Sequence, residues 1–525
     1  MKKKRIFLLA GLFILAMALL GACSKDPGVG EPGDGQGQEA QKETPRVVRL
    51  AGGDYGLSQP YTTYSRGPGS YKVKLVFDGL VAKDDQGYIP WLAEDWEVQE
   101  EGKAYVFSLR DQVNWADGQP FGPEDVVFTF NYGQDHPPVG GGDLFGPEGI
   151  LEGVEKTGDR EVTFRLKAAQ PNFIEEIFGM NILPQHIWEG VDRPDEFTGE
   201  ESLIGTGPFR LTDYNKEHGT YRFEAREDFW GPKPAVDVIE FVPVSDPVMA
   251  LENGDIDISG VPVDALARFE GKEDFTIMDN PGVFGTTLRF NMDKVEDFQS
   301  KEFRQAFAYA IDREEIVEKI ARGAGEPGSL GILPPAHIMY NDKLPSYKKD
   351  LDQAKALIEK SGISPGTYEL LVGDGQGERL GELIKEQLAA VGIDITVVTT
   401  DQKSKDARLA EGNYQLAINS YGGWARDADY LRVRFAPEVT SWSSGTPGYE
   451  NPAFSKLAED QRVETDEAKR RDQVMALQEI LAEDVPEIPL YMSKDKTVYR
   501  NSSYDGWKYE FDHHEATHNK LSFLE

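Results

Sequence analysis

The last residues of the chain contain a pattern that could hold a catalytic metal ion. His514, Glu515 and His518 form the spacing His-Glu-x-x-His, in which two histidines on a helix bind zinc and the glutamate activates a water molecule. Only seven residues follow His518, so a third ligand would have to come from elsewhere in the chain. Residues 509–512 also predict a strand or loop rather than a long helix. Three interpretations remain open: a secreted zinc peptidase, a divalent-metal site at His513, His514 or His518, and a structural histidine cluster.

A second group of chemistry-bearing residues lies in a loop that follows a predicted strand at residues 414–420. Binding loops of α/β proteins follow the carboxyl ends of strands. We therefore predict ligand contacts at Tyr421, Trp424, Arg426 and Asp427. Trp424 could instead pack within the protein, and Asp427 could be a surface carboxylate or a helix cap. Arg426 could bind a ligand carboxylate or neutralise its acidic neighbours.

Arg66 is a further candidate for binding an anionic group. It lies in a glycine-rich turn at residues 65–69, where a guanidinium could donate two parallel hydrogen bonds to a ligand carboxylate. An arginine that points into solvent is an equal interpretation. The chain has neither a Gly-x-Ser-x-Gly elbow nor a phosphate-binding glycine loop, which removes the commonest hydrolase and nucleotide-binding classes. We expect no cofactor.

The first residues predict export. Residues 2–5 are basic, and the apolar run at residues 6–20 would span roughly 22 Å as a helix, less than the ~30 Å core of a membrane. Residues 1–22 therefore predict a signal peptide. The sequence Leu-Gly-Ala-Cys that ends at Cys23 is similar to the bacterial lipobox, and Cys23 is the only cysteine, so it cannot form an internal disulfide. We expect a lipid on Cys23; the alternative is a leftover cysteine beside an ordinary signal peptide.

Composition separates a tether from a folded body. Residues 23–46 are rich in Gly, Pro, Glu, Gln and Asp and contain no aromatic residue, which predicts a flexible segment. The body that starts at residue 47 is long enough for two or three lobes. The net charge of −35 becomes −39 without the four basic residues of the signal peptide. This charge argues against nucleic-acid binding and mildly favours neutral or cationic ligands, although solubility alone explains it.

The first half of the body predicts short strands separated by turns. Apolar and polar residues alternate in three segments, as in half-buried strands. These segments are residues 105–109, 162–166 and 221–225.

From about residue 284 helices and strands alternate. A helix is predicted at residues 303–310, and Asp312 is predicted to cap the next one. A helix at residues 380–391 lies between strands at 368–372 and 393–398, and this βαβ order predicts parallel strands with a right-handed crossover. The remaining expected elements are the strand at 414–420, one long helix at 454–483 and a final strand at 488–492.

Seven segments, in order, resemble those of the large solute-binding proteins of peptide and nickel ABC importers, the extracellular family 5 type. They are residues 90–98 (PWLAEDWEV), 113–118 (VNWADG), 123–126 (PEDV), 205–209 (GTGPF), 250–257 (ALENGDID), 303–313 (FRQAFAYAIDR) and 484–491 (DVPEIPLY). Each is short, but together they cover nearly the whole mature chain.

The resemblance implies an α/β fold of two lobes joined by a hinge, with an extra domain inserted in the first lobe. We expect the first lobe at residues 47–60, 203–281 and 490–525, the inserted domain at 61–202, and the second lobe at 282–489.

The resemblance also implies a function and roles for some residues. We expect a non-enzymatic, monomeric protein that binds a peptide or peptide-like solute between its lobes, delivers it to an ABC permease, and is held at the membrane by its lipid. In peptide-binding members a Trp and then an Asp stack on the ligand and pair with its α-amino group, which matches Trp424 and Asp427. Ala428 stands where the family commonly has proline, so Asp429 competes for the second role. A nickel or metal-chelate ligand is the alternative within the family.

Overall fold

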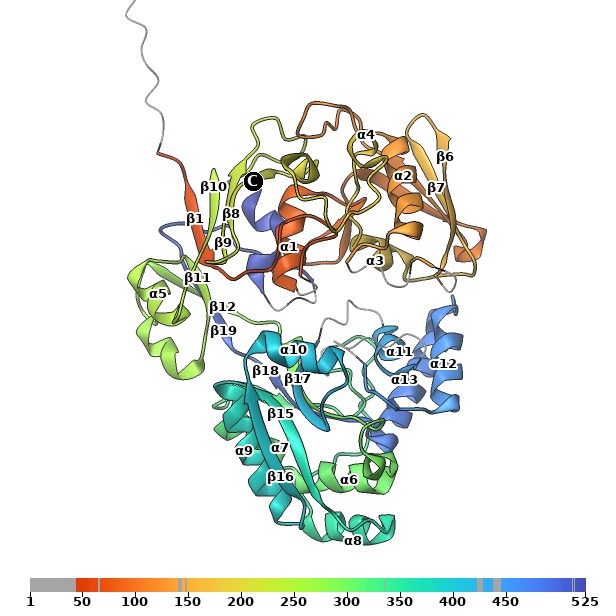
Figure 1. The fold of residues 1–525 in the computed structure, drawn as a ribbon, viewed down its shortest axis with the longest axis vertical. Helices are drawn as coiled ribbons and strands as arrows, with labels where there is room; N and C mark the ends of the chain where they lie inside the picture. The colour runs from red at the N-terminus through yellow and green to blue at the C-terminus, as the bar shows by residue number, and fades with distance from the viewer. Residues whose placement is uncertain are drawn as a thin grey trace, which may run out of the picture. The chain divides into compact units, whose positions relative to one another are not determined.

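The computed structural model describes residues 44–64, 67–139, 144–146, 149–335, 337–422, 428–437, 445–511, 513 and 515–525, and Figure 1 shows their helices and strands. The helices are α1 (Gly67–Val76), α2 (Pro123–Asp135), α3 (Phe173–Phe178), α4 (Gln185–Trp188), α5 (Pro247–Asn253), α6 (Lys301–Ala310), α7 (Arg313–Lys319), α8 (Leu351–Ser361), α9 (Gln376–Ala389), α10 (Gln402–Ala410), α11 (Tyr430–Phe435), α12 (Pro452–Arg462) and α13 (Glu467–Asp484). All of them lie in one unit, Pro45–Glu525.

One four-stranded sheet collects strands that lie far apart in the sequence. Its order is β1 (Val47–Ala51), β10 (Val238–Val242), β9 (Thr220–Ala225) and β8 (Phe209–Asn215). β1 is parallel to β10, and the other pairs are antiparallel. Apolar side chains of α1 and the C-terminal Phe523 belong to the same buried core as this sheet. The alternation at residues 221–225 correctly predicted β9.

A second four-stranded sheet contains the other two strands predicted from alternation. Its order is β4 (Ala93–Gln99), β5 (Ala104–Leu109), β7 (Glu161–Leu166) and β6 (Leu151–Gly158), and a short hairpin of β2 (Val81–Lys83) and β3 (Tyr88–Pro90) precedes it. Helix α2 covers the sheet: the ring of Phe130 lies 4.7 Å, between centroids, from that of Phe164. The burial of these aromatic rings explains why both strands alternate so regularly.

A six-stranded sheet forms the other main layer of the fold. Its order is β14 (Gly325–Pro327), β18 (Glu487–Ser493), β13 (Phe284–Phe290), β17 (Leu416–Gly422), β15 (Thr367–Gly373) and β16 (Asp394–Thr400). β15 and β16 are parallel and are joined through α9, which confirms the predicted βαβ unit. β18 confirms the strand predicted at residues 488–492, but it is not the final strand, because β19 (Lys496–Arg500) follows it.

Two adjacent connections join the six-stranded sheet to a three-stranded sheet of β11 (Ile258–Val261), β19 (Lys496–Arg500) and β12 (Phe275–Asp279). Residues 280–283 connect β12 to β13, and residues 494–495 connect β18 to β19. β12 pairs with β19, and β13 pairs with β18, so the two connections run between paired strands. Two short segments that connect one part of the fold to the other are the expected form of a hinge.

The helices show one confirmed cap and one wrong prediction. Asp312 Oδ1 accepts a hydrogen bond of 3.0 Å from the backbone N–H of Glu315 at the start of α7, as predicted. The single helix predicted at residues 454–483 is wrong, because α12 ends at Arg462 and α13 begins at Glu467. The carboxylate of Asp466 accepts from the backbone N–H groups of Ala468 and Lys469 at 3.1 Å each, so it starts a new helix.

The predicted division into lobes and an inserted domain stays a prediction. The strands of the second four-stranded sheet all lie within residues 61–202, whereas α1, from the same range, packs in the core of the first sheet. β18 continues past residue 489, where the second lobe is predicted to end. The predicted signal peptide, Cys23 and the tether up to residue 43 lie outside the described residues.

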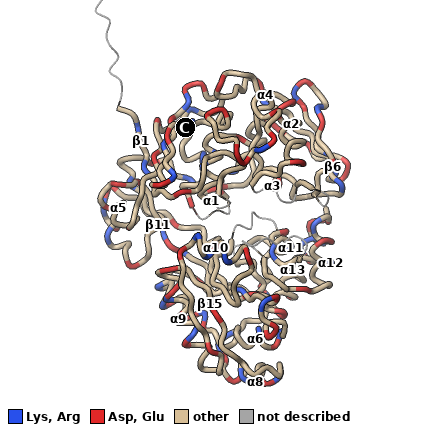
Figure 2. Tube along the Cα trace, in the orientation of Figure 1, with Lys and Arg blue, Asp and Glu red and all other residues tan. Residues whose placement is uncertain are grey.

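Two further observations concern the surroundings of the protein. Within the part of the chain that is described, no helix combines the length and apolarity needed to cross a membrane. Figure 2 shows acidic residues spread over the whole trace with basic residues among them.

Candidate functional site

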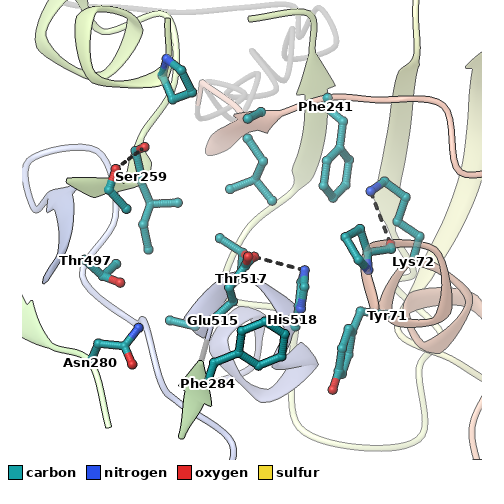
Figure 3. A pocket seen from close by; sticks show the side chains of 18 of the residues that line it. Tyr71, Lys72, Phe241, Ser259, Asn280, Phe284, Thr497, Glu515, Thr517 and His518 are labelled. Carbon is teal, nitrogen blue, oxygen red and sulfur yellow. Dashed lines mark hydrogen bonds and ion pairs between the residues drawn. The ribbon is translucent and has the colours of Figure 1, made fainter. Parts of the chain in front are cut away.

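A cavity of about 440 Å³ lies beside the hinge. Its walls come from the end of β1, one face of α1, β10, the strands β11 and β19, and the C-terminal segment around residues 515–523. Asn280 and Asp495, one from each hinge connection, also line it. Figure 3 shows side chains from these elements, Asn280 among them, around one common space. A cavity at a hinge can change its shape when the lobes move.

One wall is a stack of aromatic rings. Tyr71 of α1 stacks on His518 with centroids 4.4 Å apart and an interplanar angle of 15°. His513 meets the edge of the same tyrosine at 4.8 Å. His518 Nε2 lies 3.1 Å from Glu515 Oε2, and this contact is drawn in Figure 3. Burial raises the pKa of Tyr71 well above its usual value, helped by the nearby carboxylates of Glu510 and Glu515.

Lys72 stands next to this stack and is only 4% exposed. Its Nζ lies 3.9 Å from the ring centroid of Phe241, 4.8 Å from that of Tyr55 and 5.2 Å from that of Tyr221. It donates one hydrogen bond of 3.3 Å to the carbonyl oxygen of Pro68. Burial lowers the pKa of Lys72 to about 7, and the Glu515 carboxylate opposes this shift only in part.

The other two lysines that line the cavity are paired with carboxylates. Lys520 bonds to the buried Asp78, and Lys496 bonds to Asp279. The Asp495 carboxylate on the opposite side accepts a hydrogen bond of 3.0 Å from Ser493 Oγ. Burial raises the pKa of Asp495. The cavity therefore offers both an acidic and a basic side chain to a bound molecule.

Most of the loop residues predicted as ligand contacts lie outside the described residues, namely Trp424, Arg426 and Asp427, and so does Arg66. Tyr421 is described: it lies at the end of β17, is 2% exposed and belongs to the core of the six-stranded sheet. The guanidinium of Arg434 lies 5.7 Å from its ring centroid. Its predicted role as a ligand contact stays a prediction.

The structure does describe Asp429, the competing carboxylate. Arg432 donates to both of its oxygens, with Nη2 2.7 Å from Oδ2 and Nε 2.9 Å from Oδ1. Gln461 Nε2 donates to Oδ1 at 2.7 Å. The Asp429 residue is 3% exposed and Arg432 is fully buried. These contacts make Asp429 part of a buried structural pair.

The His-Glu-x-x-His segment lacks the local structure that the zinc motif uses. Ala516–His518 form one short 3₁₀ turn after Glu515, whereas the motif needs an α-helix that puts both histidines on one face. His514 lies outside the described residues. Among the residues that are described, no group of three or more His, Cys, Asp or Glu side chains could hold a metal ion.

Lys72 is one of the cavity residues that the sequence did not single out. Residues 71–76 alternate between apolar and lysine side chains, Tyr-Lys-Val-Lys-Leu-Val, which is the pattern of a strand with its lysines in solvent. The segment instead forms the helix α1, in which Lys72 is buried and Lys74 is half-buried. The preceding Gly-Pro-Gly was the available signal, since proline is favoured in the first turn of a helix.

Comparisons with known proteins agree with this architecture. The family model for "Bacterial extracellular solute-binding proteins, family 5 Middle" matches residues 87–441. The dipeptide-binding protein of Escherichia coli K12 is 28% identical over 429 residues, which are 76% of this chain and 79% of that protein. Two solved structures share the fold. The oligopeptide-binding protein AppA of Bacillus subtilis, in complex with a nonapeptide, has a TM-score of 0.78 at 22% identity and covers 92% of this chain and 100% of its own. NikZ of Campylobacter jejuni, in complex with Ni(L-His), has a TM-score of 0.78 at 21% identity, with coverages of 91% and 99%.

The chain is a two-lobed α/β protein of the periplasmic-binding type. It belongs to family 5 of the bacterial extracellular solute-binding proteins, and its general role is therefore solute binding.

Proposed function

We propose that this protein is an extracytoplasmic, lipid-anchored binding protein that captures a peptide and delivers it to an ABC permease. The observation that carries the proposal is the cavity at the hinge, which is lined by aromatic rings and by charged groups of both signs, in a chain of this family. A peptide in its ionised form has an ammonium and a carboxylate, so both kinds of partner are needed. The dipeptide-binding relative supports the same ligand class.

The mechanism is capture by a change of shape and involves no catalysis. An open form admits the ligand, and contacts made only in the closed form shift the population toward it. The permease then recognises the closed form. The two short connections at residues 280–283 and 494–495 are the segments that would absorb the motion.

Asp427 is the proposed partner of the ligand ammonium. A buried ammonium without a counter-charge is costly, and Asp429 is already held by Arg432 and Gln461. Because Asp429 is paired in this way, we assign the role of ammonium partner to Asp427, the other carboxylate of this loop. Trp424 and Arg426 are proposed neighbours of the ligand, as are Tyr421 and Arg66.

The first test is native mass spectrometry of the chain without residues 1–23, purified from cells and then treated with a chelator. A bound mass of a few hundred daltons that survives chelation and fragments as a peptide is the expected result. Asp427→Asn should lose this mass while it keeps the melting temperature. Asp429→Asn is the matched control and should lower the melting temperature. Retention of the ligand by Asp427→Asn would remove Asp427 from the site.

The membrane anchor is tested separately. Cys23→Ser in the full chain should move the protein from the membrane fraction to the soluble fraction of the envelope, because each buried methylene of a lipid chain contributes about 0.8 kcal/mol to anchoring. Continued membrane association of the variant would contradict the lipid assignment and leave the binding function untouched.

A metal chelate is the second candidate ligand. The observation that favours it is the position of His518 on the cavity wall, with His513 5.1 Å away between ring centroids. Nickel or zinc that copurifies at one equivalent and leaves on chelation would favour this candidate over a peptide.

A further inference from the structure

The cavity contains one buried cation, Lys72, whose charge the Glu515 carboxylate and the surrounding rings compensate only in part. Three lysines line the cavity, and two of them have carboxylate partners: Lys520 with Asp78 and Lys496 with Asp279. Lys72 forms no ion pair with any residue in the described part of the chain. An ammonium has three N–H donors, and the carbonyl of Pro68 accepts from only one of them.

The surroundings of Lys72 would suit an ammonium whose counter-ion is supplied by a bound ligand. The rings of Phe241, Tyr55 and Tyr221 face Nζ, and an aromatic ring compensates a buried positive charge by about 0.5–2 kcal/mol. This gain is smaller than the cost of removing an ammonium from water. Figure 3 shows Lys72 beside Phe241, at the edge of the same space that Tyr71 and His518 border.

A negatively charged group of the ligand would remove this deficit. A carboxylate next to Nζ would form charge-assisted hydrogen bonds in surroundings with little water, where such bonds are strongest. A ligand with an amide in the same place would offer Nζ only a neutral acceptor and leave its charge without a counter-ion. The lysine would therefore discriminate strongly between a ligand acid and its neutral amide.

We propose that Lys72 is a specificity-determining residue of the cavity and binds a carboxylate of the ligand. This inference rests on the proposed binding of peptides, and it adds that the ligand must present an anionic group to α1. The carboxylate can come from the C-terminus of a peptide or from an acidic side chain, and the two sources share the same chemistry.

The alternative role of Lys72 is purely structural, as a cation held by Phe241 within the core of the first sheet. In that case its replacement would change stability without changing the choice of ligand. The experiment must therefore measure the preference between two ligands in each protein, because a general loss of affinity does not separate the two roles.

The test uses isothermal titration calorimetry on the full mature chain at pH 6.5. The probes are alanine peptides of two to five residues, each as the free acid and as the C-terminal amide. In a second pair, Ala-Glu-Ala amide and Ala-Gln-Ala amide, the negative charge is on a side chain instead of the C-terminus. The proteins are the unchanged chain, Lys72→Met, Lys72→Arg, and Lys496→Met as the matched control, since Lys496 also lines the cavity but is paired.

In at least one of these peptide pairs, the unchanged protein should bind the acidic member about tenfold to hundredfold more tightly than the neutral member. This is the range expected for a charge-assisted hydrogen bond. Lys72→Met should erase this preference, Lys72→Arg should restore most of it, and Lys496→Met should keep it. If the preference is seen only with the alanine peptides, Lys72 binds the C-terminal carboxylate of the peptide. If it is seen only with the second pair, Lys72 binds an acidic side chain of the peptide.

Peptide binding with the same acid-to-amide ratio in the unchanged protein and in Lys72→Met would overturn this inference and leave the proposed function standing. Absence of binding to every peptide would overturn the peptide assignment, and this inference with it. Melting temperatures of all four proteins show whether each variant is folded, and Lys72→Arg retains the charge if Lys72→Met does not fold.

Discussion

Tyr64 donates a hydrogen bond of 2.7 Å from its hydroxyl to Asp406 Oδ2, across 342 residues of sequence. Nearby, Lys403 Nζ lies 3.2 Å from Asp54 Oδ2. Both contacts join the segment before α1 to α10, which connects β16 and β17 of the six-stranded sheet. Asp54 is also held on its own side, by a hydrogen bond of 2.7 Å from the hydroxyl of Tyr214. We call these two contacts the latch, because they tie the segment before α1 to α10.

Removing the latch should favour the open form. Tyr64→Phe deletes a hydrogen bond to a carboxylate, and such a bond contributes about 1.5–3 kcal/mol when it is well formed. We expect ligand affinity to fall about tenfold and the radius of gyration of the unliganded protein, measured by small-angle X-ray scattering, to rise. Tyr449→Phe is the control, because it also deletes a hydrogen bond from a tyrosine hydroxyl to a carboxylate, that of Asp484 at 2.8 Å, and touches neither contact of the latch. Unchanged scattering and affinity in Tyr64→Phe would show that the contact does not stabilise closure.

The sequence predicted the fold well where one face of an element is buried. The strands β5, β7 and β9 follow their apolar periodicity because each packs one face on a core. β15 is a continuous apolar run instead, because Leu370 and Leu371 pack in cores on its two faces. The helices α12 and α13 were predicted as one, since the apolar spacing continues across their junction. The break depends on the local cap at Asp466, which competes with continuation of the helix.

The site was less accessible to prediction than the fold. Glycine-rich and aromatic loop residues pointed to the segment after β17, but the described cavity is built mainly from α1, β10 and the C-terminal segment. These elements converge only through tertiary packing. The buried position of Lys72 could not be predicted from periodicity, because the same alternating residues would suit an exposed strand.

A buried ion pair should be the most sensitive point of the six-stranded sheet. Arg434 donates to both oxygens of Glu487 at 2.7 Å, and Arg289 Nε lies 3.7 Å from Oε2 of the same carboxylate. Burial by itself would lower the pKa of Arg434, but Glu487 reverses the shift and raises it. Glu487→Gln removes the charge of the carboxylate to which the buried guanidinium of Arg434 donates twice, and should lower the free energy of unfolding by about 3–5 kcal/mol.

The matched control for this pair is an exposed one. Lys301 Nζ lies 2.7 Å from Glu483 Oε1, and the two side chains are 37% and 60% exposed. Glu483→Gln should change the free energy of unfolding by less than about 1 kcal/mol. Denaturation with urea measures both variants. Equal effects of the two substitutions would contradict the assigned importance of burial.

Lys72 should make stability depend on pH. Its pKa is lowered from 10.5 to about 7 by burial, so between these values the unfolded chain binds one proton more than the folded chain. The free energy of unfolding therefore rises with pH across this window, and the full cost of the buried charge is present below about pH 7. The titratable groups that face Lys72 are Tyr55, Tyr221 and Glu515; burial raises the pKa of Tyr221 to about 12.

Lys72→Met removes this dependence, and the comparison with the unchanged protein isolates it. Lys74, whose pKa is also lowered to about 7 by burial, is present in both proteins and cancels in the difference. The advantage of Lys72→Met should be greatest near pH 6 and should shrink by about 1.4 kcal/mol per pH unit between pH 7 and 10. Urea denaturation without ligand at several pH values measures it. A difference that stays constant with pH would mean that Lys72 titrates alike in the folded and unfolded chains. Its ammonium would then not be the buried, incompletely compensated charge that the ligand is proposed to meet.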